Sequence, residues 1–210
     1  MTVTAAMVKS LREETGAGMM ECKNALVETK GDVDGARAWL RKKGLATAAK
    51  RAGRAAQEGQ VAAYIHPGGR VGVLVEVNSE TDFVAKNEDF QTLVKDIAMH
   101  IAAASPAAAL YISKEDVPAD VLEKEKEIYR EQAKQAGKPD KVLDKIAEGK
   151  LKDFYATFCL LEQPFVKEPK QTIGELVQAK IAVIKENIVV RRFCRFRVGE
   201  DIEIPAGSEQ

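Results

Sequence analysis

The sequence predicts an α+β fold in which an N-terminal three-helix bundle and a linker precede a core domain. In the core we expect a small three-stranded antiparallel sheet packed on helices, with an antiparallel helical hairpin projecting from it. Apolar residues recur at helical spacing over most of the chain, but with a period of two over residues 58–77 and 187–198. Charged residues make up 30% and aromatic residues 6%, which is typical of long solvated helices rather than a thick sheet sandwich.

The chain of 210 residues is long enough for one medium domain and a small one. We expect four parts: the bundle at 1–45, a basic linker at 46–57, the core at 58–199 and a flexible tail at 200–210. The helical hairpin is inserted into the core at about residues 114–152.

Composition narrows the function classes. Lys plus Arg and Asp plus Glu each number 32, so the chain lacks the basic excess expected of a protein that wraps nucleic acid. The three cysteines lie far apart and show no zinc-ligand spacing, so we expect no metal site and no cofactor. No apolar run reaches 18 residues, and the first residues do not resemble a secretory signal, so we expect a cytoplasmic protein.

Glycines divide the first part into three short helices. The first is predicted from Thr4 to Arg12, and the second from Met19 to Lys30. Asp32 is a suitable N-cap for the third, which is expected to end at Gly44. Together these helices can close only one small core.

The segment from Arg41 to Arg54 carries six basic residues and no acidic one. One interpretation is a contact with RNA or phosphate. The favoured one is a solvated, alanine-rich helix that links the two domains, because no aromatic residues are interleaved for base stacking.

Two strands joined by the turn His66–Arg70 predict a β-hairpin. A third strand is predicted at 187–198, with Ile188, Val190, Cys194, Phe196 and Val198 on one face and Arg191, Phe193, Arg195 and Arg197 on the other. Helices are expected at Glu88–Ala104, with His100 in a structural role, and at 172–186, capped by Thr172.

The helical hairpin is predicted from two charged helices with narrow apolar seams. Ser113–Asp116 resembles a capping box, and Gly137–Pro139 turns the chain. A helical hairpin that projects from a domain either binds a partner or remains a solvated pair of helices.

A strand-to-helix corner follows the β-hairpin at Asn78–Asn87. Thr81 is a suitable N-cap, since its hydroxyl can accept hydrogen bonds from N–H groups two or three residues on. Asp82 and Phe83 then fall in the first helical turn. Physics alone favours Asp82 complementing the helix dipole and Phe83 joining the core. The alternative is a corner that presents a carboxylate and a phenyl ring to a partner.

Three stretches resemble the bacterial elongation factor Ts family: Thr15–Lys23, Thr81–Lys86 and Gln132–Pro139. That family exchanges the nucleotide of the translational GTPase elongation factor Tu. The resemblance spans nearly the whole chain. It implies a factor of protein biosynthesis, not an enzyme, whose partner is elongation factor Tu in its GDP-bound and nucleotide-free forms.

The resemblance also implies which residues meet the GTPase. Thr81, Asp82, Phe83 and Val84 are expected beside its magnesium and phosphate site, where they would promote GDP release by dislocating Mg²⁺. A bundle of the ubiquitin-associated type is expected to dock on a helix of its nucleotide domain. Further contacts are expected from six residues: Leu11, Arg12, Met19, Met20, His66 and Ile184.

Some of these assignments have an alternative. Met19 fits the apolar stripe of its own helix, so packing in the core is an equal alternative to a partner contact. His66 matches the second of two related hairpins found in longer family members, whereas Thr81–Val84 matches the first. Lys185 stands where the family has glycine, so only Ile184 is carried over from that contact element.

A homodimer is expected for a related reason. Longer members hold two copies of the hairpin unit, and this chain has one. Pairing with a second copy, most simply about a two-fold axis, would restore the doubled surface and give a two-plus-two complex with the GTPase.

Other function classes fit less well. An RNA- or ribosome-binding scaffold would use the basic segment and the arginine-rich strand, but the zero net charge argues against it. An enzyme is not supported, because two histidines and scattered cysteines assemble no catalytic constellation. A ubiquitin-like binding adaptor would account for the bundle alone.

Overall fold

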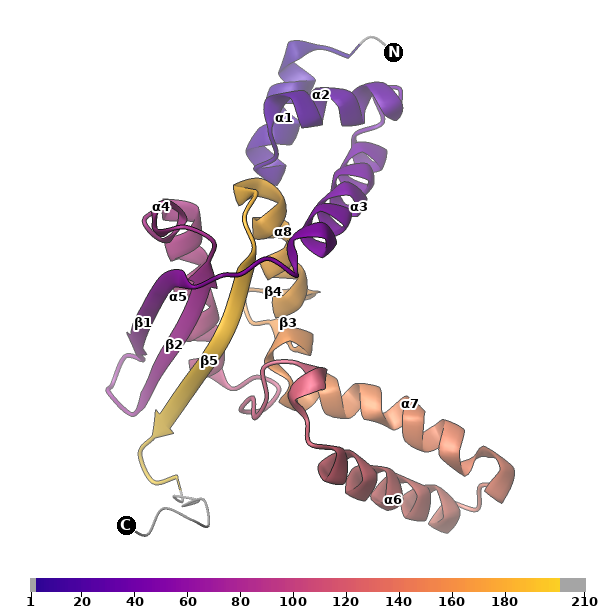
Figure 1. The fold of residues 1–210 in the computed structure, drawn as a ribbon. Helices are drawn as coiled ribbons and strands as arrows, with labels where there is room; N and C mark the ends of the chain where they lie inside the picture. Colours follow the sequence, from indigo (N-terminus) through magenta and orange to yellow (C-terminus); the bar gives the residue numbers. More distant parts are fainter. Residues whose placement is uncertain (1–2, 201–210) are drawn as a thin grey trace.

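The computed structural model describes residues 3–200, and within them eight α-helices accompany a three-stranded and a two-stranded antiparallel sheet (Figure 1). The predicted α+β class is confirmed. Of the predicted tail, residues 201–210 lie outside the described residues. In chain order the elements are α1 (Ala5–Thr15), α2 (Met19–Glu28), α3 (Val33–Arg51), β1 (Glu58–Ile65), β2 (Val71–Ser79), α4 (Asp82–Ala85), α5 (Glu88–Ala103), η1 (Lys114–Asp116), α6 (Ala119–Gln135), α7 (Asp140–Phe158), η2 (Leu160–Glu162), β3 (Pro164–Phe165), β4 (Glu168–Thr172), α8 (Ile173–Ile184) and β5 (Ile188–Arg197).

The first three helices enclose a small core of their own. Thr4 caps α1 by accepting a hydrogen bond from the Met7 N–H at 3.3 Å, and Asp32 caps α3 through the Asp34 N–H at 3.1 Å. Gly16 ends α1 in the left-handed conformation, with φ of 67°. The buried residues of this core are Val8, Leu11, Cys22, Ala25, Leu26 and Ala36.

Helix α3 was expected to end at Gly44. In the structure it continues to Arg51. It crosses α8 beside Gly44, where a side-chain methyl group would come within 3.0 Å of Ala182 Cβ. A glycine inside a helix costs about 1 kcal/mol relative to alanine. Close packing on α8 offsets that cost, so the glycine marks a helix crossing rather than a helix end. Figure 1 shows α3 beside α8, joining the bundle to the core.

The three-stranded sheet has the order β1–β2–β5, with both pairs antiparallel. Ala62 and Tyr64 of β1 face the core together with the alternating valines of β2, while Val61 and Ile65 point to solvent. Helices α5 and α8 cover the inner face. Its buried residues include Val73, Val75, Val77, Phe90, Leu93, Ile97, Ile101, Ile173, Ile181, Ile188 and Val190.

A β-bulge overturns the predicted faces of the last strand. Val77 pairs with Val190 and Glu76 with Arg192, which leaves Arg191 as the extra residue. Beyond the bulge the alternation reverses, because the side-chain period of a strand is two. Phe193 therefore packs on the core, and Phe196 lies on the outer face. Cys194 pairs with Leu74 on the same outer face.

The helical hairpin of α6 and α7 stands away from the sheet (Figure 1). Its second helix runs to Phe158, beyond the predicted end near residue 152. The predicted capping box is present, with Ser113 and Asp116 as partners. A small cluster of Val117, Phe154 and Cys159 closes the base of the hairpin, and Arg130 pairs with Asp144 across it at 2.6 Å.

His100 of α5 is buried and structural, as expected. Its Nε2 lies 3.0 Å from the Gln163 side-chain oxygen, and its Nδ1 accepts a hydrogen bond from the Val166 N–H at 3.2 Å. The accepting Nδ1 makes Nε2 the protonated nitrogen of a neutral imidazole. These two hydrogen bonds join α5 to Gln163 and to Val166, in the turn between β3 and β4. The two-stranded sheet formed by β3 and β4 was not predicted from the sequence.

Candidate functional site

The strand-to-helix corner contains a single helical turn, α4, supported by one side chain. Thr81 is its N-cap, and the Thr81 Oγ1 accepts a hydrogen bond from the Val84 N–H at 3.4 Å. Thr81 has extended backbone angles, and Asp82 begins the helix immediately after it. The predicted cap is therefore confirmed, and it fixes the direction in which the next two side chains leave the backbone.

Asp82 and Phe83 both face solvent. The Asp82 carboxylate forms an ion pair with Lys86 at 2.7 Å, and this hydrogen bond lowers the pKa of Asp82. The Lys86 ammonium also lies 6.0 Å from the centre of the Phe83 ring. The corner therefore presents an ionised carboxylate and a phenyl ring side by side.

The exposure of Phe83 excludes the interpretation in which its ring joins the core. The ring is 80% exposed, so it is not part of the core. Val84, the next residue, is half-buried and packs on the core, which anchors the turn from below. The geometry fits a corner built to present Phe83 outward.

The turn that follows α8 lies against this corner. The Glu186 carboxylate accepts hydrogen bonds from the Thr81 hydroxyl at 2.7 Å and from the Thr81 N–H at 3.0 Å. Ile184 ends α8, half-buried against the core. Glu186 could not be singled out from the sequence, because its partner Thr81 is distant along the chain and no local pattern marks the contact.

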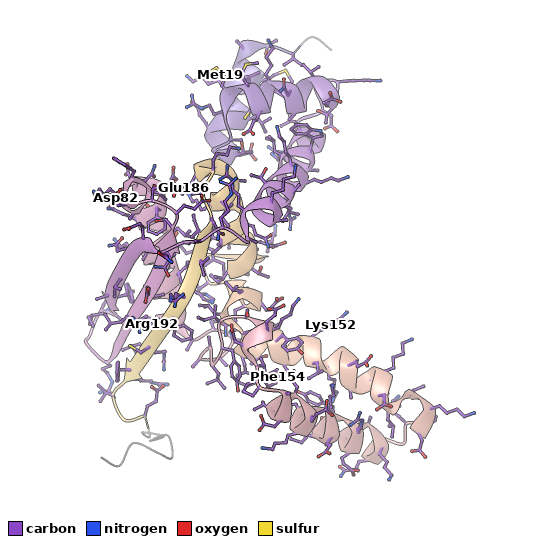
Figure 2. All side chains as sticks on the ribbon, in the orientation of Figure 1. Met19, Asp82, Lys152, Phe154, Glu186 and Arg192 are labelled. Atoms are coloured by element: carbon purple, nitrogen blue, oxygen red, sulfur yellow. The ribbon has the colours of Figure 1, made fainter. Side chains whose placement is uncertain are left out.

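Helix α2 begins near the same turn. Glu21 forms an ion pair with Lys185 at 2.9 Å, which places the start of α2 beside the end of α8. The neighbouring Met19 and Met20 are 56% and 64% exposed, so Met19 is not packed in the bundle core. Figure 2 shows Met19, Glu186 and Asp82 on one side of the molecule.

The other predicted partner contacts, Arg12, Leu11 and His66, differ in their exposure to solvent. Arg12 is exposed on α1, whereas Leu11 is 1% exposed and fills the bundle core. A direct partner contact by the Leu11 side chain would require the bundle to open, so the structure gives Leu11 a packing role. His66 is exposed in the turn between β1 and β2, with its Nδ1 3.2 Å from the Tyr64 hydroxyl. That turn lies at the opposite end of β2 from the corner.

Within residues 3–200, no cluster of three or more His, Cys, Asp or Glu side chains is arranged to hold a metal ion. Within the same residues, no helix combines the length and apolar character needed to span a membrane.

Comparison with known proteins identifies the family. The family described as Elongation factor TS matches residues 4–200. The chain belongs to the elongation factor Ts family. Elongation factor Ts of Acetivibrio thermocellus is 62% identical over 201 residues, covering 96% of this chain and 92% of the relative. Those of Geobacter sulfurreducens and Caldanaerobacter subterraneus subsp. tengcongensis are 58% and 60% identical, over 97% and 96% of this chain and 93% and 99% of theirs.

The region shared with elongation factor Ts includes the bundle, the α4 corner, the helical hairpin and the last strand. These two relatives match over nearly their whole length.

Proposed function

We propose that this chain is the guanine-nucleotide exchange factor for elongation factor Tu in the cytoplasm, acting in translation elongation and catalysing no bond-making reaction. The observation that carries the proposal is the exposed Phe83 ring on a capped turn, in a member of the elongation factor Ts family. Phe83 is the most exposed large apolar side chain of the described residues, and an aromatic ring held outward on a capped turn is available for a partner to bury.

An exchange factor works by linkage. It stabilises the nucleotide-free GTPase, and it must then weaken nucleotide binding by the same coupling free energy. Each tenfold acceleration of GDP release requires about 1.4 kcal/mol. A phenyl ring provides a large buried area with few rotatable bonds.

In this mechanism Phe83 inserts between side chains of the GTPase beside its magnesium site. The insertion displaces a helix of the GTPase, so the ligands of Mg²⁺ lose their support. Mg²⁺ itself contributes to nucleotide affinity by binding the phosphates. Asp82 holds the geometry through hydrogen bonds to the partner, and Thr81 and Val84 keep the turn in place.

The bundle supplies a second contact. Arg12, Met19 and Met20 are exposed, and methionine side chains adapt to an apolar partner surface. Leu11 supports this surface from inside the bundle. His66 and Ile184 are proposed as further contacts, His66 from the distant hairpin turn and Ile184 from the turn beside the corner.

A homodimer is the proposed assembly. The outer face of the sheet carries exposed apolar side chains, with Phe196 69%, Ile65 64% and Val61 63% exposed. Glu76 and Arg192 on the same face pair with each other at 2.6 Å, so these two charges balance each other. An exposed apolar face of this kind suits a second copy of itself about a two-fold axis, giving a two-plus-two complex with the GTPase.

The RNA-binding alternative is weakened by the partners of the basic segment. Arg41 pairs with Glu175, Lys43 with Glu21, and Arg51 and Arg54 with Glu80. Cations already paired within the protein are poorly available to phosphates.

Stopped-flow release of a fluorescent GDP from elongation factor Tu tests the proposal. We expect the wild-type protein to accelerate release by orders of magnitude, and Phe83→Ala to lower the maximal rate by at least about tenfold, or about 1.4 kcal/mol. Leu110→Ala is the matched control, because Leu110 is 64% exposed at the base of the helical hairpin. An inactive wild-type protein would reject the exchange function. Equal loss in both variants would reject the specific role of Phe83.

A further inference from the structure

Three segments that are far apart in the sequence meet behind the α4 corner. They are the end of α3 at residues 51–54, the residues before α4 at 79–81, and the turn after α8 at 185–187. We propose that Glu80 and Glu186 are positioning residues for nucleotide exchange, which hold α4 so that Phe83 is presented in one fixed orientation. This inference rests on the proposed exchange function and concerns how the exposed ring is kept ready.

Helix α4 needs such support because it is too short to hold itself. It has four residues, and none of them is buried. A helical turn of this length is unstable alone, since nucleation fixes several backbone angles for few hydrogen bonds. Val84 and Ala85 pack on the core from below, and contacts from other segments must hold the start of the turn.

Glu186 provides the first of these contacts. Its two carboxylate oxygens bind the hydroxyl and the N–H of Thr81, at 2.7 and 3.0 Å. The same hydroxyl accepts the hydrogen bond from the Val84 N–H that begins α4. Because one carboxylate holds both donors of Thr81, it fixes the rotamer of the capping side chain and hence the start of the helix.

Glu80 provides the reciprocal contact. Its carboxylate accepts a hydrogen bond from the Asn187 N–H at 2.7 Å and lies 3.5 Å from Arg51 and 3.4 Å from Arg54. The hydrogen bond from Asn187, with the arginines, lowers the pKa of the Glu80 carboxyl, so this half-buried group stays ionised near neutral pH.

The two contacts are reciprocal, and we call them the clasp. Glu80 binds the N–H of Asn187, the residue after Glu186. Glu186 in turn binds the N–H of Thr81, the residue after Glu80. Asn187 also donates from its side chain to the Arg54 carbonyl oxygen at 2.7 Å. The end of α3, which leads from the bundle, is thereby tied to the same corner. Each loop fixes the other, and a partner meeting Phe83 meets a turn that is already ordered.

A corner that is ordered before binding is an advantage. If α4 became ordered only during binding, the cost would reduce the binding free energy available to displace the nucleotide. Loss of the clasp removes no hydrogen bond of α2, the helix that carries Met19 and Met20, because α2 is held to the turn by the separate Glu21–Lys185 ion pair. It therefore acts on the step that uses Phe83. We expect Glu186→Gln and Glu80→Gln to lower the maximal rate of GDP release about tenfold, with less than about a twofold change in the half-saturating concentration.

The test combines this exchange assay with hydrogen–deuterium exchange of the free protein. In both variants the amides of residues 83–87 should exchange faster than in the wild type, because the hydrogen bonds of α4 open more often. Asp96→Asn is the control, since it also removes a carboxylate charge, from an ion pair with Lys167 that is not part of the clasp. It should leave both readouts unchanged. The double variant Glu186→Gln/Thr81→Val should lose no more than the larger single loss.

The outcomes separate the two proposals. Unchanged amide exchange at residues 83–87 in Glu186→Gln would overturn the clasp, and faster amide exchange with an unchanged GDP-release rate would overturn its positioning role. A wild-type protein that fails to release GDP would reject the exchange function, while the amide measurement would still decide whether the clasp holds α4. If Glu80→Gln lowers the melting temperature strongly, Glu186→Gln decides alone, because Glu186 has no ion pair to α3.

Discussion

At the scale of single residues, Phe83 stands out because leaving a phenyl ring in water forgoes about 1.5–3 kcal/mol of burial free energy. Phe90, seven residues on, is fully buried beneath the sheet. Phe90 therefore has a packing role, whereas the Phe83 ring is free for the proposed contact with the GTPase. We expect Phe83→Ala to change the free energy of unfolding by less than about 0.5 kcal/mol, and Phe90→Ala to lower it by about 3–5 kcal/mol. Urea denaturation measures both. A large loss in Phe83→Ala would mean that the ring packs in solution.

Lys185 occupies a conformation that suits glycine. It ends α8 with φ of 67°, and left-handed geometry costs a residue with a side chain about 1–2 kcal/mol. Its ion pair with Glu21 is partly exposed and returns at most about 1 kcal/mol. We expect Lys185→Gly to raise the free energy of unfolding by up to about 1 kcal/mol.

Lys185→Ala is the matched comparison, because it removes the ion pair and keeps the backbone cost. It should be less stable than the wild type in the same urea titration. Equal stability of the alanine and glycine variants would show that the backbone conformation contributes nothing.

At the scale of elements, the sequence predicts those features that depend on residues close together in the chain. The caps at Thr81 and Thr172, the capping box at Ser113 and the period of the first two strands were all predictable, since each rests on residues within a few positions of one another. The bulge at Arg191 was not, because it arises from pairing with β2. Likewise, Gly44 ends no helix, because packing on α8 outweighs its propensity.

The candidate site divides in the same way. The corner and its exposed residues could be located from the sequence through a resemblance, and the cap from local chemistry. The contact between Glu186 and Thr81 joins residues 105 positions apart. No sequence period or spacing encodes such a contact, so only the folded chain reveals what holds the corner.

The pairing of His100 with the β3–β4 turn predicts a pH dependence. Burial lowers the pKa of His100 below its ordinary value of 6.5, so the folded protein holds the imidazole neutral. The unfolded chain then binds more protons as the pH falls through 6.5, and stability is lost in that direction. We expect the free energy of unfolding to decrease below pH 6.5 by up to about 1.4 kcal/mol per pH unit from this group.

Urea denaturation between pH 7.5 and 5.5 measures this dependence. His100→Gln should be less stable throughout but should lose less stability over the interval, because it removes the titrating group. A variant with the same pH slope as the wild type would assign the dependence to other residues.

At the scale of the whole molecule, the core lies between two projections. The bundle is joined to it through α3 and α8, and the helical hairpin leaves from the opposite end (Figure 1). The proposed partner contacts of α2, α4 and the end of α8 lie on one side, whereas the apolar outer face of the sheet belongs to a separate surface. Dimerisation through that face would leave the corner of each copy free for its own GTPase.

The dimer can be tested by placing a charge on its proposed interface. Phe196 is 69% exposed, so Phe196→Glu should cost the isolated chain little, but two copies related by a two-fold axis would bury like charges near each other. We expect sedimentation equilibrium at micromolar concentration to give a dimer for the wild type and a monomer for Phe196→Glu. Leu110→Glu should remain dimeric, because Leu110 is 64% exposed at the base of the helical hairpin, away from the sheet. A monomeric wild type that still exchanges nucleotide would show that one copy suffices, and a dimeric Phe196→Glu would move the interface elsewhere.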